Sequence, residues 1–250
     1  MSAAPAIRTG IGGWVFPPWR GVLYPPKLPQ AKELAHASRE VTAIEINGTF
    51  YGAQKPESFR RWHDDTPDGF VFSVKGPRFA THRKDLAAAG PSIERFLASG
   101  VLELRGKLGP ILWQFAPFLR FDEAGFDAFL ALLPHEVDGR TLRHVVEVRH
   151  ASFDTPAFPE LLRRHRVAVA LVDDEKYPAL EHLTADFVYA RLRRSAIDEP
   201  AGYPPEALDA WAGRARGWQA AGLDCFIYFI NGAKVRAPAA AAALLSRLQP

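Results

Sequence analysis

Two glutamates, Glu45 and Glu147, stand near the ends of short apolar runs and have the chemistry of a catalytic carboxylate pair. A second polar residue follows each of them two positions later, Asn47 in IEIN and Arg149 in VEVR. Residues two apart in a strand point to the same face. One carboxyl that donates a proton and a second that accepts one can catalyse hydrolysis or isomerisation. We therefore predict that Glu45 and Glu147 act as acid and base in a hydrolase or an isomerase, with a separation that the sequence leaves open.

Basic residues follow another apolar run, in the stretch SVKGPRFATHRKD. Lys75 ends the run, and together with Arg149 it is expected to tune the carboxylates and to hold an anion. His82 is the histidine of this loop, and imidazole suits general acid or base catalysis near neutral pH. We therefore add Lys75 and His82 to the predicted catalytic group.

Polar and aromatic side chains at or just beyond the ends of the apolar runs form a larger candidate set for substrate binding. These residues are Trp14, Trp19, Asn47, Thr49, Tyr51, Arg78, Gln114, Arg149, Asp173, Arg191, Tyr228, Asn231 and Lys234. One alternative is that they satisfy one another in a purely structural plug. Burying many charges is costly even when they are paired, so the set as a whole favours contact with a ligand.

An anion site is predicted in the loop NGAKVRAP, residues 231–238. This loop combines a glycine with Lys234 and Arg236, and its proline suits the first turn of a helix. Arg191 and Arg193 come from the preceding apolar run. In many TIM barrels phosphate binds in the loops after the seventh and eighth strands. The alternative is a solvated basic loop in front of a helix.

Eight apolar runs must position these residues, and they alternate with segments of helical spacing. The runs span residues 7–14, 41–47, 70–75, 109–115, 144–149, 167–173, 186–191 and 225–231. The clearest amphipathic segments span residues 56–67, 122–134, 156–165, 204–222 and 237–248. Alternating strands and helices indicate a parallel sheet. Eight such units in 250 residues predict the α/β class and a closed (β/α)₈ TIM-like barrel, whose active site lies at the carboxyl ends of the strands.

The unit between the sixth and seventh runs departs from this pattern. Residues 174–185, DEKYPALEHLTA, are barely enough for a parallel crossover with one helical turn. We expect an irregular barrel at this point. No linker, repeat or low-complexity tract divides the chain, so we predict one domain over residues 1–250.

Composition restricts the partners and the compartment. The net charge of +3, from 31 basic and 28 acidic residues, is too small for a general nucleic-acid coat. A single cysteine, Cys225, excludes an internal disulfide and fits a reducing compartment. The start MSAAPAIRTG lacks the features of a secretory signal, and no apolar stretch is long enough to span a membrane. We expect a cytoplasmic protein without membrane contacts.

Neither a nucleotide cofactor nor a metal is expected. Gly10, Gly12 and Gly13 suggest a dinucleotide loop, but Val15 occupies the third glycine position of that motif. The glycines are better explained by a close approach of the backbone to a ligand or a neighbouring strand. The possible metal ligands are Glu45, Glu147, Asp173 and His82. Lys75 and Arg149 would compete with a cation at such a site, so we predict no bound metal.

Seven motifs run nearly end to end and resemble the YecE-like family, also called domain of unknown function 72. The motifs are GGWVFPPWRGVLYP, EINGTFY, FVFSVKGPRFATHRKDL, KLGPILWQF, VEVRH, DFVYARL and YFINGAK. The resemblance implies a TIM-type barrel with loose kinship to sugar isomerases, and no established substrate or reaction. Two motifs depart from the family pattern, at three positions. Arg193 and Arg194 replace His-Gly after DFVYARL, and Ile230 replaces the first of two asparagines.

Three functions are compatible with these residues. The first is an enzyme that binds a small anionic compound, sugar-like or phosphorylated, and uses acid and base catalysis. The second is a protein that binds or hydrolyses nucleic acid or nucleotides, motivated by the basic loops with interleaved aromatic residues. The third is a metabolite sensor that binds the same compound without converting it. The small net charge ranks nucleic acid behind a small anion.

Overall fold

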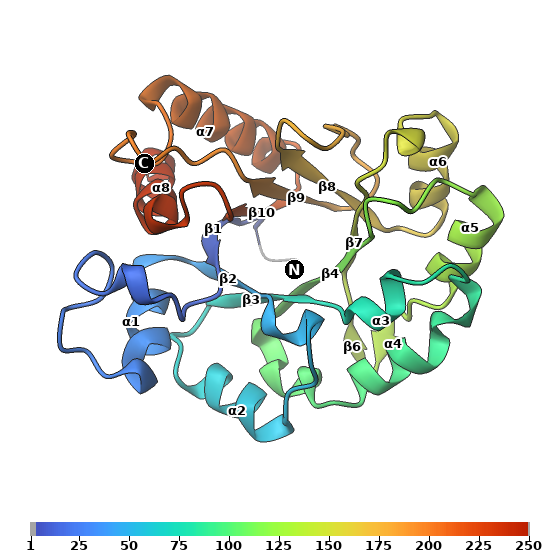
Figure 1. The fold of residues 1–250 in the computed structure, drawn as a ribbon, viewed down its shortest axis with the longest axis horizontal. Helices are drawn as coiled ribbons and strands as arrows, with labels where there is room; N and C mark the ends of the chain where they lie inside the picture. The colour runs from blue at the N-terminus through green and yellow to red at the C-terminus, as the bar shows by residue number, and fades with distance from the viewer. Residues whose placement is uncertain (1–3, 250) are drawn as a thin grey trace.

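A computed structural model describes residues 4–249 and shows eight parallel strands that close into a barrel (Figure 1). The strands are β1 (Ile7–Gly12), β2 (Ala43–Ile46), β3 (Val71–Lys75), β4 (Leu108–Gln114), β7 (His144–Glu147), β8 (Ala168–Asp173), β9 (Phe187–Leu192) and β10 (Asp224–Phe229). Their order around the barrel is β1-β10-β9-β8-β7-β4-β3-β2. A two-residue antiparallel pair, β5 (Glu136–Val137) and β6 (Arg140–Thr141), precedes β7. The predicted α/β class and TIM-like barrel are confirmed.

Helices form a layer around the outside of the barrel (Figure 1). They are α1 (Glu33–Glu40), α2 (Pro56–Asp64), α3 (Arg78–Thr81), α4 (Gly90–Leu97), α5 (Glu123–Ala131), α6 (Ala157–Arg164), α7 (Pro205–Ala220) and α8 (Ala237–Leu248). Proline in the first turn starts α2, α7 and α8, where its missing N–H has no intrahelical partner to lose. Within residues 4–249, no helix is both long and apolar enough to cross a bilayer.

The connection between β8 and β9 contains no helix anywhere in the described residues 174–186. This is the unit that the sequence predicted to be irregular. The short spacing leaves room for a loop, which bends back to the carboxyl end of β9 through an ion pair between Asp174 and Arg193. The sheet nevertheless closes, because β8 and β9 pair directly over four residues.

The inside of the barrel changes from apolar to charged along the strands. Alternate residues face inward, and a buried cluster separate from the layer beneath the helices contains Val71, Leu112, Val145, Phe187 and Phe226. Two positions further along these strands stand Ser73, Gln114, Glu147, Tyr189 and Tyr228. The hydroxyls of Ser73 and Tyr228 lie 2.7 Å apart, although their strands are not neighbours. Lys75 and Arg191 end this inward series at the carboxyl end.

Strand β1 contributes two glycines where other strands contribute side chains. A Cβ atom on Gly10 would lie 1.9 Å from the carbonyl oxygen of Ala43 in β2. A Cβ on Gly12 would lie 2.8 Å from Cγ2 of Ile230. These glycines therefore allow neighbouring parts of the barrel to approach closely, which is one of the two roles expected from the sequence.

Candidate functional site

A cavity of about 620 Å³ opens at the carboxyl ends of the strands. It brings together nine of the residues proposed from the sequence: Trp14, Asn47, Tyr51, Lys75, Gln114, Arg149, Arg191, Asn231 and Lys234. The loops after β1, β2 and β10 and the ends of β3, β4, β7 and β9 supply them. Candidates that lay far apart in the sequence thus line one space, as expected for this end of a TIM barrel.

The lining of this cavity carries positive charge without negative charge. Its cationic residues are Lys75, Arg149, Arg191, Arg193 and Lys234. Among the described residues that line the cavity, none is an aspartate or a glutamate. Glu45 and Glu147, the two carboxylates predicted to act as acid and base, lie beneath the lining and are 0% exposed.

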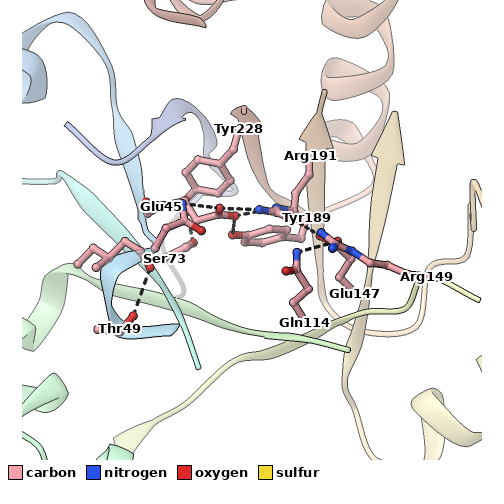
Figure 2. A network of polar contacts seen from close by, with 11 residues as sticks. Glu45, Thr49, Ser73, Gln114, Glu147, Arg149, Tyr189, Arg191 and Tyr228 are labelled. Atoms are coloured by element: carbon pink, nitrogen blue, oxygen red, sulfur yellow. Dashed lines mark hydrogen bonds and ion pairs between the residues drawn. The ribbon is translucent and has the colours of Figure 1, made fainter. Parts of the chain in front are cut away.

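Arg191 joins the two glutamates across the barrel (Figure 2). Its Nε and Nη2 donate to the carboxylate of Glu45 at 3.0 and 2.9 Å, and its Nη1 donates to Glu147. The guanidinium is 3% exposed, so these contacts are shielded from water. The two carboxylates therefore meet through a shared cation in the middle of the barrel, and this arginine forms a floor under the cavity.

Neutral and cationic neighbours complete the coordination of each carboxylate (Figure 2). Glu45 accepts hydrogen bonds from the Tyr189 hydroxyl at 2.7 Å and from Nδ2 of Asn47 at 3.0 Å. Glu147 accepts from Nε2 of Gln114 at 2.8 Å and from Nε of Arg149 at 2.7 Å. We call these residues together with Arg191 the carboxylate layer. Every member is tied to at least one other, as buried charges require.

The charge states of the two glutamates follow from these contacts. Burial raises the pKa of each carboxyl. For Glu45, the charge and hydrogen bonds of Arg191, the Tyr189 hydroxyl and the charge of Lys75 together outweigh burial, and the net pKa is lowered. For Glu147 the charges of Arg191 and Arg149 likewise exceed the effect of burial and bring the pKa to about 2. Both groups are ionised at neutral pH, so neither is poised to donate a proton. Their role as an acid and base pair stays a prediction, and their contacts are those of supports for the two arginines.

Lys75 occupies a different position, because its amine faces the cavity without an anionic partner. The residue is 5% exposed, and Nζ lies 3.9 Å from the centroid of the Phe50 ring. Within residues 4–249, no hydrogen bond or ion pair to Nζ is found. Burial and then the charge of Arg191 lower the pKa of Lys75 from 10.5 to about 8, despite the attraction of the two glutamates. Lys75 can therefore exchange a proton near neutral pH.

A residue that the sequence did not single out, Tyr177, lies against two arginines of the cavity lining. The guanidinium carbons of Arg149 and Arg193 lie 4.7 and 5.2 Å from the centroid of the Tyr177 ring. Tyr177 belongs to the helix-free loop before β9. Arg193 also pairs with Asp174 at 3.0 Å, and the Asn231 amide oxygen, when turned toward it, accepts from its Nη2 at 2.6 Å. In the sequence, the only hint of the contact between Arg193 and Tyr177 was the pair of consecutive arginines after DFVYARL.

The loop after β10 places Lys234 beside two aromatic rings. Its Nζ lies 4.8 Å from the Phe16 ring centroid and 5.4 Å from that of Trp19, and burial lowers its pKa. Trp19 itself is fully buried, and its indole N–H donates to the carbonyl of Lys234 at 2.9 Å. The prediction that Trp19 contacts the substrate is therefore corrected. Its buried side chain instead holds the loop after β10 through the Lys234 carbonyl.

Aromatic side chains line the cavity near β1 and β2. Trp14 packs edge-on against Trp62, with ring centroids 5.1 Å apart. Trp62, on α2, also reaches the cavity. Tyr51 is 68% exposed and is free to contact a bound molecule.

Two further candidates lie in the barrel wall outside the cavity lining. The Thr49 hydroxyl donates to the Lys75 carbonyl at 2.6 Å, so it holds the end of β3. Tyr228 bonds to Ser73 in a deeper layer of the barrel. The predicted substrate contacts of Thr49 and Tyr228 are replaced by these internal contacts, because both side chains are already covered.

Three more candidates, Asp173, Arg78 and His82, are not among the residues that line the cavity. Asp173 follows Val172, which faces inward, so its own side chain faces outward and accepts from the Tyr203 hydroxyl at 3.0 Å. The guanidinium of Arg78 lies over the Phe79 ring. His82 packs against Phe50 with ring centroids 5.2 Å apart. Among the described residues, no group of three histidine, cysteine, aspartate or glutamate side chains is arranged to hold a metal ion.

Comparison with known protein families identifies the family of this chain. A family model described as "Protein of unknown function DUF72" matches residues 8–250. The chain belongs to the DUF72 family. The UPF0759 protein YunF of Bacillus subtilis is 26% identical over 159 residues, which are 62% of this chain and 54% of YunF. YecE of Escherichia coli K12 is 28% identical over 148 residues, 59% of this chain and 50% of YecE.

These alignments span about half the length of the two curated relatives. A crystal structure of a DUF72 protein from Thermotoga maritima superimposes with a TM-score of 0.77 at 23% identity, and it covers 97% of this chain and 98% of its own. The resemblance inferred from the seven motifs is confirmed, and the chain shares its fold with this DUF72 structure. The names of these relatives assign no substrate or reaction.

Proposed function

We propose that this DUF72 protein is an enzyme that binds a small anionic, sugar-like or phosphorylated compound in the cavity and transfers a proton through Lys75. The observation that carries this proposal is the imbalance of charge in the lining, where five cations face the cavity and no carboxylate does. Among the described residues, Lys75 and Lys234 have no carboxylate partner, whereas the three arginines are paired with carboxylates that lie outside the lining. Cations that line a concave, partly dry site attract anions strongly, because few solvent dipoles compete with them.

The size of the cavity supports a small molecule. Its volume of about 620 Å³ falls within the range of small-molecule sites, roughly 300–1,000 Å³. Arg149, Arg193 and Lys234 supply donors for carboxylate or phosphate oxygens. Asn47 and Gln114 present amide groups to hydroxyls, while Trp14 offers an apolar ring face that suits a sugar.

Lys75 is the group best suited to proton transfer. A pKa of about 8 keeps a useful fraction of both protonation states near neutral pH. The carboxylate layer contributes indirectly, since Glu45 and Glu147 hold Arg191 and Arg149 in place. The proposal thus keeps the acid and base chemistry expected from the sequence and gives it to Lys75.

Thermal-shift titration tests the binding part. We expect inorganic phosphate, sugar phosphates or small dicarboxylates to raise the melting temperature of the wild-type protein, while neutral sugars do not. Replacement of Lys234→Met, with loss of a cation from the cavity, should lower the apparent affinity about tenfold, as for a lost charged hydrogen bond of roughly 1.5 kcal/mol. Arg39→Gln, an exposed arginine at the end of α1 that leads into the amino end of β2, is the control and should leave the titration unchanged.

The alternatives give distinct results in the same experiment. A shift by single-stranded oligonucleotides that falls steeply with salt, and no shift by small anions, would favour the nucleic-acid function over ours. A compound that binds and is recovered unchanged by mass analysis would identify a metabolite sensor. Equal responses of wild type and Lys234→Met to every anion would contradict the proposed site.

A further inference from the structure

We propose that Lys75 is a nucleophile that forms a covalent imine with its ligand, which narrows the ligand to anionic aldehydes and ketones. This inference rests on the proposed anion site, because the cationic wall is what brings the carbonyl compound to the amine. It differs from that proposal in the bond that forms, and the two can fail separately.

The position of Lys75 is the first argument. It ends β3 on the inward face of the barrel, where its main-chain carbonyl accepts the Thr49 hydroxyl at 2.6 Å. The Phe50 ring, 7% exposed, lies 3.9 Å from Nζ and covers one side of the amine. The position of a nucleophile is more precisely defined on a strand, where packing confines its side chain, than on a loop. The amine therefore has a fixed place and an open side toward the cavity.

The absence of an anionic partner is the second argument. A structural lysine buried to this degree is normally paired with a carboxylate. Lys107 in this protein illustrates the satisfied case, since its Nζ donates to two main-chain carbonyls and to the Thr66 hydroxyl. In contrast, Nζ of Lys75 bonds to none of the described residues, 4–249, although Glu45 and Glu147 lie close enough to influence it. Arg191 and Arg149 hold those carboxylates instead, and the amine is left available.

Burial first, and then the charge of Arg191, favour the neutral form of the Lys75 amine that attack requires. Arg191 and Arg149 lower the pKa of Lys75, and Glu45 and Glu147 raise it. The His82 imidazole also lies near Lys75, and burial and then the charge of Lys75 lower its pKa. With a pKa of about 8, about a tenth of the molecules carry an unprotonated Lys75 near pH 7, whereas an exposed lysine is almost wholly protonated. Desolvated lysines beside other cations are known to become nucleophiles for carbonyl groups in this way.

The reaction balances without a cofactor or an oxidant. The lone pair of the unprotonated Nζ forms a bond to the carbonyl carbon, and the carbonyl π electrons move to the oxygen, which takes up one of the two Nζ protons. The carbinolamine then loses this oxygen as water, with a second proton from solvent, and a C=N bond remains. Relative to the ammonium form, two of its three protons leave in the water and the third stays on the iminium nitrogen. The iminium has the same charge as the ammonium, so the surrounding ions need no rearrangement.

Reductive trapping with glyoxylate and sodium cyanoborohydride tests the imine. We expect one adduct per wild-type chain, heavier by the mass of glyoxylic acid less one oxygen atom, and located at Lys75 by peptide mapping. It should form at least about tenfold faster than adducts on exposed lysines such as Lys84, because of the larger neutral fraction of the amine. Lys75→Arg should abolish it, while the matched exposed variant Lys84→Arg should not. Competition by inorganic phosphate on the wild type, which needs no variant, should slow trapping at Lys75 alone.

Three outcomes separate the two proposals. Trapping at Lys75 no faster than at Lys84, in a protein whose melting temperature responds to anions, would overturn the imine and leave the anion site standing. Fast trapping at Lys75 by neutral propanal as well as by glyoxylate, unaffected by phosphate, would support the nucleophile and contradict the anion site. Fast trapping by glyoxylate that phosphate suppresses supports both.

Discussion

The two ends of the barrel interior are built from opposite chemistry. At the amino end, Val71, Leu112, Val145 and Phe187 fill the space with apolar side chains. At the carboxyl end the same faces of the same strands carry charges and amides, and Arg191 bridges two buried carboxylates. Packing at the amino end needs no partner for any polar atom. Charges at the carboxyl end must be desolvated, and they remain costly unless every one is paired.

The apolar amino end and the charged carboxyl end of the same strands suit different roles, the first stability and the second the proposed binding. An apolar layer would have served at both ends if the barrel needed only to be stable. The carboxyl end instead has a paired layer of ions, and above it a wall of cations that have no carboxylate beside them in the cavity lining. The paired layer keeps the strands in register and holds Arg191 and Arg149 in position. Under the proposed function, an anionic ligand supplies negative charge at this wall.

The largest effect is expected when the bridge in the carboxylate layer is removed. Arg191→Met leaves Glu45 and Glu147 buried without their common cation, and the free energy of unfolding should fall by about 3–5 kcal/mol. Val145→Ala, its counterpart at the apolar end, should cost on the order of 2 kcal/mol. Urea unfolding of both variants at neutral pH makes the comparison. If the two losses are equal, the carboxyl end is not the more demanding of the two.

Acid should weaken the two ends differently. The pKa of Glu147 is lowered to about 2 in the folded protein, so its contribution is complete above pH 4.5 and is lost as the pH falls toward 2. The loss for this residue is about 3 kcal/mol. Unfolding curves between pH about 5 and about 2 should show a slope in wild type and in Val145→Ala, and a flatter one in Glu147→Gln. Parallel slopes in all three would show that Glu147 is not specially stabilised as an anion.

The smallest effect concerns the unpaired lysine of the wall. The pKa of Lys75 is lowered to about 8, so the folded chain holds fewer protons than the unfolded chain between pH 8 and 10.5. Wild-type stability should therefore rise by about 1 kcal/mol across this interval because of Lys75, less than the full shift implies since the amine faces an open cavity. Lys75→Met should lack this rise and be at least as stable as wild type at pH 7. The exposed variant Lys84→Met should keep the wild-type slope. A loss of stability in Lys75→Met would indicate a structural lysine.

Much of the barrel was predictable because alternation and spacing are local properties. The run 70–75 corresponds to β3 (Val71–Lys75), and the closing amphipathic segment 237–248 coincides with α8. The errors in the site arose because the direction and the burial of a side chain depend on the folded structure. Asp173 was chosen for its place at the end of a strand, but its neighbour Val172 faces inward, so Asp173 cannot. Trp19 and Tyr228 were chosen because they are aromatic residues near the ends of apolar runs, but both side chains are buried.

The sequence by itself determined which residues share a face and which end of each strand is polar. In VVEVRH, the period of two places Glu147 and Arg149 on one side of a strand, and their mutual hydrogen bond is a local consequence of that spacing. Only the tertiary structure decided which charges are consumed and which stay available. Closing the barrel brings Arg191 of β9 within reach of Glu45 on β2 and Glu147 on β7, none of them adjacent strands. Because the two carboxylates take the arginines as partners, Lys75 faces the cavity without one.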